Sequence, residues 1–117
     1  MGILKYGASS EFEFDDRLLA HLKVVIAAKL RRNEGFLLNW KVSAGVGSGR
    51  VSLWLGPTIP LQFTFFGSRD PQLNRAWIDV LADLSHSARG LVVISEADAE
   101  AVKAGAIALD ELEGLTL

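Results

Sequence analysis

The sequence predicts an α+β fold, a mainly antiparallel sheet with two long amphipathic helices packed on one face. Three observations predict it. Apolar residues recur at three- and four-residue spacing in two long segments, which is typical of helices that bury one face. Apolar and polar residues alternate in three shorter segments between residues 36 and 66, which is typical of strands. Glycine, proline and small polar residues separate these segments, as expected for turns.

The first part of the chain predicts a hairpin followed by a helix. Two short strands, 3–6 and 11–14, flank a turn, and Phe12 and Phe14 point to one side of the second strand. A helix over about 16–32 follows, with Asp15 and Asp16 as N-cap and first-turn acid, and Gly35 as its stop. Its apolar stripe consists of Leu18, Leu19, Leu22, Val25, Ile26 and Leu30.

Residues 36–42, 51–55 and 61–66 are predicted to form three strands of one sheet. One face is uniformly apolar and needs cover from the two helices. The other face is mixed, because Leu37, Trp54 and Phe66 share it with Asn39, Lys41, Ser52, Gln62 and Thr64. Three explanations are open for the mixed face: a homodimer interface, a platform for stacked bases beside Lys41 and Arg50, or cover from the N-terminal hairpin.

The last part of the chain predicts a second long helix, a short strand and a third helix. Asp70 is the predicted N-cap and Pro71 the first residue of a helix over 71–84. Residues 91–94 form a continuously apolar run, as in a buried strand. Ser95, with Asp98 three residues on, predicts a helix over about 96–104. Residues 106–117 are either a weak helix or a frayed tail, and residues 1–117 are expected to form one domain.

The composition limits the class of protein. Half of the residues are hydrophobic and the mean hydropathy is +0.26, which for a chain of 117 residues favours an oligomer, most simply a homodimer. No run is long and apolar enough for a membrane span, and the opening residues have no secretory h-region. There is no cysteine, so the cytoplasm is the expected location. A net charge of −2 gives no general attraction to nucleic acid.

Candidate site residues are few. Three glycines at 45, 47 and 49 precede Arg50, but strands flank this loop on both sides, which favours a hairpin loop over a phosphate-binding loop. Arg69 precedes the second helix and Arg75 lies in its first turn, so both could hold an anion, unless Asp70 already caps those donors. His21 and His86 have no metal-ligand spacing, and no Gly-x-Ser-x-Gly motif is present. We therefore expect no catalytic residue, no metal and no cofactor.

Three runs together resemble a known family: KYGASSEFEFDDRLLAHLKVVIAAKLRR, GSGRVSLWLGPTIPLQFTFFGSRDPQLNRAWIDVL and HSARGLVVISE. They are similar to small actinobacterial proteins described as a domain of unknown function and often labelled ATP-dependent DNA ligase. The resemblance extends from about residue 2 to residue 96. It implies membership of a family, without an activity.

The residues do not support the ligase label. Nucleotidyl transfer in that superfamily needs a lysine nucleophile in a Lys-x-Asp-Gly motif. None of the lysines fits this motif, and a chain of this length is too short for the adenylation core; the lysines are Lys5, Lys23, Lys29, Lys41 and Lys103. We predict no ligase activity.

The sequence thus favours a non-enzymatic binding or assembly module that self-associates. The expected interface residues are Trp54, Phe66 and Leu37. The alternative is a small protein that binds nucleic acid or a nucleotide through Lys41, Arg50, Arg69 and Arg75, and an accessory role in DNA metabolism is one form of this alternative.

Overall fold

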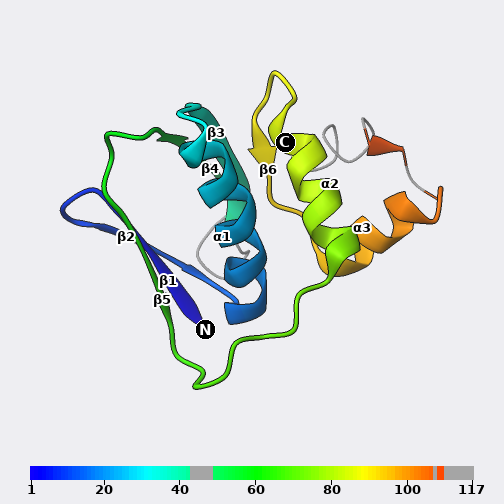
Figure 1. Ribbon diagram of the computed structural model, residues 1–117, viewed down its shortest axis with the longest axis horizontal. Coiled ribbons are helices and arrows are strands. Elements are labelled where there is room, and N and C mark those ends of the chain that lie inside the picture. Colours follow the sequence, from blue (N-terminus) through cyan, green and yellow to red (C-terminus); the bar gives the residue numbers. More distant parts are fainter. Residues whose placement is uncertain (43–48, 107, 110–117) are drawn as a thin grey trace.

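A computed structural model of the chain describes residues 1–42, 49–106 and 108–109 and confirms the predicted α+β fold (Figure 1). The helices of this part are α1 (Asp16–Arg31), α2 (Arg75–Ser85) and α3 (Glu96–Lys103). The strands are β1 (Gly2–Tyr6), β2 (Ser10–Phe14), β3 (Phe36–Val42), β4 (Gly49–Leu55), β5 (Leu61–Phe65) and β6 (Leu91–Val92). The glycine loop that precedes Arg50 and most of segment 106–117 lie outside the described residues.

The strands form two three-stranded sheets, so the prediction of one sheet through residue 66 is wrong. The β1 sheet has the order β2-β1-β5 and is antiparallel. The β3 sheet has the order β4-β3-β6, with β4 antiparallel and β6 parallel to β3. The reason is the proline-containing turn before β5, whose Pro60 carbonyl accepts the Gly7 N–H at 2.9 Å. The chain leaves β4 there and continues along β1, with Leu61 opposite Tyr6.

The N-terminal hairpin is confirmed, and it covers part of the apolar face of the β3 sheet. Trp40 of β3 meets two rings of β2 edge-on, Phe12 with its centroid at 5.3 Å and Phe14 at 5.0 Å. Such edge-to-face contacts are favourable for aromatic pairs. This contact joins the two sheets and accounts for the side to which Phe12 and Phe14 point.

Helix α1 begins as predicted but ends differently. The Asp15 side chain accepts the Leu18 N–H, and Asp16 lies in the first turn. At the other end, Asn33 takes a left-handed conformation with φ +63°, and its N–H donates to the Leu30 carbonyl. Asparagine tolerates this conformation, so Asn33 ends the helix and Gly35 does not. Gly35 has another role, described below.

Helix α2 begins four residues later than predicted. Its N-cap is Asn74, whose Oδ1 accepts the N–H groups of Ala76 and Trp77. Asp70 and Pro71 lie in the extended connection before it, and Leu73 is exposed instead of buried in the helix. The predicted start of α3 is confirmed, because Ser95 Oγ accepts the Asp98 N–H at 3.1 Å.

Helix α1 lies in the middle of the core, between the β1 sheet and helix α2. Helix α1 contacts β1 and β5 of the β1 sheet on one side and α2 on the other, and α2 in turn contacts β6 and α3 (Figure 1). No helix within the described ranges is long and apolar enough to cross a membrane. The fully buried large apolar side chains are Leu4, Leu19, Leu22, Ile26, Leu38, Leu55, Leu81, Leu84, Leu91, Val80 and Val92.

Candidate functional site

The mixed face predicted from the sequence exists on β3 and β4, and we call it the outer face. The strand register places its six residues in three opposed pairs, Leu37 with Trp54, Asn39 with Ser52, and Lys41 with Arg50. The middle pair is polar and bonded, because Ser52 Oγ donates to Asn39 Oδ1 at 2.6 Å. Trp54 is 55% exposed at one end of the face. Leu37 and Trp54 therefore lie together, as do Lys41 and Arg50.

Phe66 does not belong to this face. It is 63% exposed, but it follows β5, which pairs in the β1 sheet, so Phe66, Gln62 and Thr64 are not on the outer face. The explanation that the N-terminal hairpin covers the outer face is also wrong. Its aromatic residues lie against Trp40, on the opposite face of β3. The hairpin reaches Trp54 only at the backbone, where the Tyr6 hydroxyl donates to the Trp54 carbonyl at 2.7 Å.

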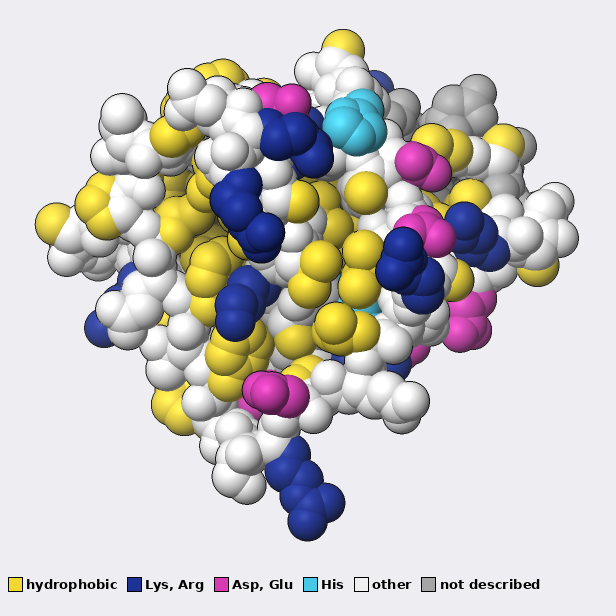
Figure 2. All heavy atoms as spheres, in the orientation of Figure 1, with side chains coloured by type: hydrophobic (Ala, Val, Ile, Leu, Met, Phe, Trp, Pro, Cys, Tyr) yellow, Lys and Arg dark blue, Asp and Glu magenta, His cyan; other side chains and the backbone are white. Residues whose placement is uncertain are grey.

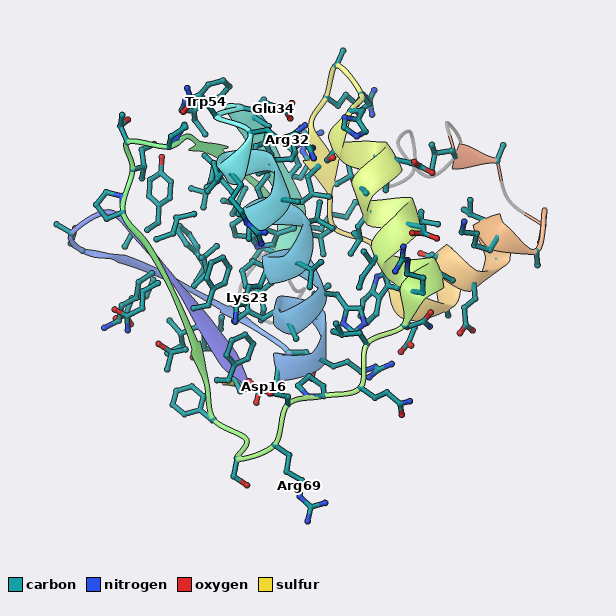
Figure 3. All side chains as sticks on the ribbon, viewed as in Figure 1. Asp16, Lys23, Arg32, Glu34, Trp54 and Arg69 are labelled. Carbon is teal, nitrogen blue, oxygen red and sulfur yellow. The ribbon has the colours of Figure 1, made fainter. Side chains whose placement is uncertain are left out.

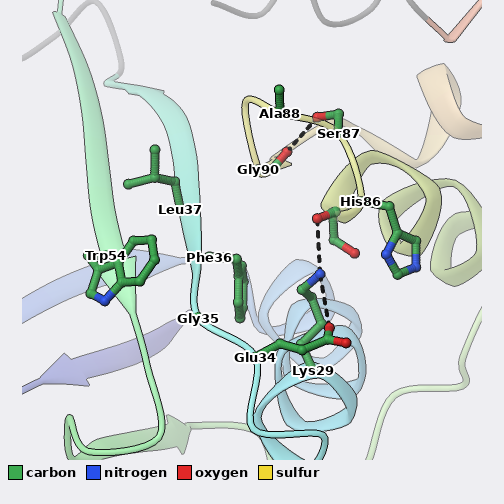
Figure 4. A pocket seen from close by; sticks show the side chains of 11 residues that line it. Lys29, Glu34, Gly35, Phe36, Leu37, Trp54, His86, Ser87, Ala88 and Gly90 are labelled. Carbon is green, nitrogen blue, oxygen red and sulfur yellow. Dashed lines mark hydrogen bonds and ion pairs between the residues drawn. The ribbon is translucent and has the colours of Figure 1, made fainter.

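A pocket of about 420 Å³ opens beside Trp54, and we call it the Trp54 pocket (Figure 4). Trp54 and Leu37 form one wall, and the loop after α2 forms the other. A glycine at position 35 makes this arrangement possible, because a Cβ there would lie 2.5 Å from Trp54 Cζ2. The indole ring thus lies directly on the backbone of Gly35.

The charged group of the Trp54 pocket is a buried lysine that the sequence analysis did not single out. The side chain of Lys29 is only 8% exposed. Its Nζ donates to the Ser85 carbonyl at 3.1 Å, lies 3.3 Å from Glu34 Oε1, and lies 5.3 Å from the centre of the Phe36 ring. The ammonium group is thus partly neutralised and also contacts an aromatic face.

Glu34 is shared between two cations. Its Oε2 accepts the Arg32 Nε–H at 3.3 Å, and its Oε1 faces Lys29. Arg32 and then Lys29, both as hydrogen-bond donors, hold the pKa of Glu34 below its ordinary value. Of these two cations only Lys29 lines the pocket, so Glu34 divides its charge between one group inside the pocket and one outside it. The sequence did contain a signal for Lys29, because it lies four residues after Val25 and seven after Leu22, in line with the buried stripe of α1.

The four basic residues predicted to bind an anion do not gather in one place. Lys41 and Arg50 are paired on the outer face. Arg75 is bound to Asp79, one turn along α2, with Nε 3.4 Å from Oδ1. Arg69 lies in the connection before α2 and extends away from the molecule (Figure 3). None of the pockets described here contains two of these four side chains.

The cavity beside Arg69 does not favour an anion either. It has a volume of about 480 Å³ and lies between α1 and the connection before α2. Its cations, Arg17, Lys23 and Arg69, are balanced by the three carboxylates of Asp15, Asp16 and Asp70. Lys and Arg side chains are likewise scattered among apolar and acidic ones on the face shown in Figure 2.

A second polar cluster, which we call the helix junction, ties α1, α2 and α3 together. Arg17 donates Nε to Glu96 Oε1 at 3.0 Å and a second N–H to Oε2 at 2.7 Å. Asn74 Nδ2 donates to Glu96 Oε2 at 2.7 Å and to Glu100 Oε1 at 3.1 Å. The donors Arg17 and Asn74, in that order, lower the pKa of Glu96 to about 2.

His21 is the buried member of the helix junction. Its Nε2 accepts the Asn74 N–H at 2.8 Å, so the proton is on Nδ1, which donates to the Arg17 carbonyl at 2.7 Å. Its ring packs against Trp77 with the centroids 4.4 Å apart. Both nitrogen atoms are used within the protein, so the imidazole has a structural role and is not offered to a ligand.

The described part of the chain contains no group of three or more His, Asp or Glu side chains placed to hold a metal ion. Of the polar regions described above, the cavity beside Arg69 is balanced in charge and the helix junction is bonded within the protein, which leaves the open Trp54 pocket and the outer face beside it. The latter two form the candidate site.

Comparison with known proteins identifies the family. No curated protein and no solved structure matches the chain. A family model described as a domain of unknown function, DUF7882, matches residues 1–96, which include every described strand and the helices α1 and α2. The chain therefore belongs to the family described as domain of unknown function DUF7882.

Proposed function

We propose that this protein is a cytoplasmic, non-enzymatic binding module that self-associates as a homodimer through the edge of β4. One observation carries the proposal: β4 is a seven-residue edge strand with an exposed tryptophan at its end. Among the strands of the described residues, its one neighbour is β3. An edge strand of this length presents backbone groups that can pair with another strand, and exposed aromatic residues are typical of interface centres.

The sequence of β4 suits pairing with a second copy of itself. If Ser52 lies on a two-fold axis between two antiparallel β4 strands, Arg50 of one copy lies opposite Trp54 of the other. The two-fold axis repeats this cation–aromatic pair on the other side. The Tyr6 hydroxyl, bound to the Trp54 carbonyl, marks where the open edge ends.

Light scattering coupled to size-exclusion chromatography tests the proposal at micromolar concentration. We expect a dimer for the unmodified chain and a monomer for Ser52→Lys, because two lysines then oppose each other at the axis. The matched control is Gln62→Lys, which adds the same charge to β5, one of the two edge strands of the other sheet, and leaves the dimer intact. An unmodified chain that is monomeric, or equal effects of the two lysines, contradicts the proposal.

Two exposed aromatic residues provide a second matched pair. Trp54→Ala removes an aromatic side chain from the proposed interface, and Phe66→Ala removes one from the other sheet. We expect the dimer dissociation constant to rise at least about tenfold for Trp54→Ala, as for an interface hot spot, and to stay unchanged for Phe66→Ala. The reverse result would place the interface at the end of β5.

A second function, binding of single-stranded nucleic acid, is favoured by one observation. Lys41 and Arg50 share the outer face with Trp54, and a base-stacking ring beside cations is typical of such sites. Fluorescence anisotropy of a labelled oligonucleotide at low salt tests it. This function requires binding that salt weakens and that Lys41→Gln reduces, whereas Arg69→Ala, far from the outer face, leaves it unchanged. If neither single-stranded DNA nor RNA binds at low salt, this second function is ruled out.

A further inference from the structure

We infer that the Trp54 pocket is a binding site for a small aromatic monocarboxylate. The inference goes beyond self-association and does not depend on it. It rests on three features of the pocket: an incompletely bonded lysine ammonium, an exposed indole wall, and the ends of two helices at its margin.

The ammonium of Lys29 supplies the anion contact. A lysine has three N–H donors, and Lys29 Nζ makes one hydrogen bond, to the Ser85 carbonyl, and one ion pair, with Glu34 Oε1, beside the face of the Phe36 ring. One donor remains for an acceptor that enters the pocket. Because the side chain is more than nine-tenths buried, a hydrogen bond to this donor is shielded from water. Glu34 divides its charge between Lys29 and Arg32, so it does not fully balance the charge of Lys29, and one carboxylate can complete the balance.

The aromatic part of the ligand contacts Trp54. The indole ring of Trp54 lies against Gly35 on the β3 side, yet Trp54 stays 55% exposed and lines the pocket. The indole Nε1 lies on the side of the ring that faces away from Lys29 (Figure 4), so the pocket offers the apolar part of the indole to the ligand. A flat ring packed against the indole removes apolar area of both from water.

The helices determine the charge of the ligand. Both α1 and α2 end at the pocket, since Lys29 and Ser85 belong to their last turns. The C-terminal end of a helix carries partial negative charge, which opposes any anion and opposes a multiply charged one most, so the Lys29 ammonium has to offset it. A phosphate ester would also need several donors where one is present. A monocarboxylate fits both conditions, and a volume of about 420 Å³ is ample for one with a single ring system.

Benzoate is the probe that tests this inference, with benzamide and phenyl phosphate as controls of the same ring size. The readout is the indole N–H signal of Trp54 in ¹⁵N-resolved NMR spectra, assigned by its loss in Trp54→Phe. Trp40 and Trp77 serve as internal references. For nine non-hydrogen atoms at about 0.4–0.5 kcal/mol each, we expect benzoate to bind with a Kd of about 1 mM.

We expect benzamide and phenyl phosphate to bind at least about tenfold more weakly than benzoate. Lys29→Met should weaken the binding of benzoate by the same factor. Lys103→Met, on α3, should leave the binding of benzoate unchanged. Ser52→Lys should still bind benzoate, which separates this inference from the proposed dimer. Equal binding of benzoate and benzamide, tighter binding of phenyl phosphate, or no shift of the Trp54 signal overturns the inference, and these comparisons need no variant to fold.

Discussion

The helix junction and the Trp54 pocket are both built from charged and aromatic side chains at the ends of helices, but they differ in how completely their polar groups are bonded. In the junction, both ring nitrogens of His21 and both carboxylate oxygens of Glu96 have partners inside the protein. In the pocket, Lys29 Nζ has one hydrogen bond, to the Ser85 carbonyl, and an ion pair with Glu34, and Trp54 Nε1 has no hydrogen-bond acceptor among the described residues.

This difference separates a structural cluster from a candidate binding site. A polar group whose bonds are complete loses them if a ligand binds, whereas an incompletely bonded one gains. Residue types alone do not make the distinction, because the junction contains the more catalytic-looking set of histidine, arginine and glutamate. Stability measurements on matched pairs of variants test this difference.

The largest effect is expected at His21. His21→Ala leaves the Asn74 N–H without its acceptor and opens a cavity beside Trp77, so we expect the free energy of unfolding to fall by about 3 kcal/mol. Urea denaturation measures it. The matched control, His86→Ala, replaces an exposed histidine at the edge of the pocket and should change stability by less than about 0.5 kcal/mol. Similar values for both histidines would contradict the contrast.

The next effect concerns the start of α2. Asn74→Ala removes the cap of two backbone N–H groups and should lower the free energy of unfolding by about 1–2 kcal/mol. Asp70→Ala removes the residue that sequence reasoning selects as the cap, and we expect a change below about 0.5 kcal/mol. Urea denaturation measures both changes. A larger loss of stability for Asp70→Ala than for Asn74→Ala would mean that α2 begins before Arg75.

The pH dependence of stability should reveal Glu96. Its pKa is lowered from 4.5 to about 2 in the folded protein, so the ionised form favours folding. This contribution is complete above about pH 4.5 and is lost as the pH falls towards 2. Thermal unfolding between pH 7 and pH 2 should show a shallower decline for Glu96→Gln than for the unmodified chain. Glu11→Gln, in an exposed pair with Lys5, is the control, and its curve should follow that of the unmodified chain.

The smallest effect on stability is expected at Trp54. Its ring is more than half exposed, so Trp54→Ala should lower the free energy of unfolding by no more than about 1 kcal/mol, even though it removes a wall of the pocket. Circular dichroism during urea denaturation measures this change without relying on tryptophan fluorescence. A loss as large as that of His21→Ala would make Trp54 a structural residue and remove the contrast.

The sequence predicted where helices and strands lie along the chain better than it predicted which of them contact each other. Short-range signals such as the caps at Asp15 and Ser95 depend on neighbours three residues away, and both are confirmed. The partner of β5 depends on a turn that redirects the chain to β1, and alternation of polar and apolar residues does not encode which strand lies alongside. The cap of α2 was misplaced because Asp-Pro is a stronger local signal than Asn74, whose role depends on contacts with α1 and α3.

The candidate site was predicted in part. Alternation in β3 and β4 was enough to place Leu37, Trp54, Lys41 and Arg50 on one face. It was not enough for the pocket, which brings Lys29 of α1 to the loop after α2 through a contact between positions 29 and 85. The sequence held one local indication, which is that His21 and Lys29 are polar residues on the apolar face of α1. Both are buried.

The pairing of β1 has a consequence for the order in which the protein folds. Gly2 lies opposite Phe14 on one side and Phe65 on the other, so β1 acquires its first neighbour early in synthesis and its second only after most of the β3 sheet has emerged. Until then its second edge is open to strands of other chains. Pairing of β1 with β5 closes a long loop and is slow, so this edge stays open for some time. A chain that stops before residue 61 never closes it and should aggregate where the 117-residue chain does not.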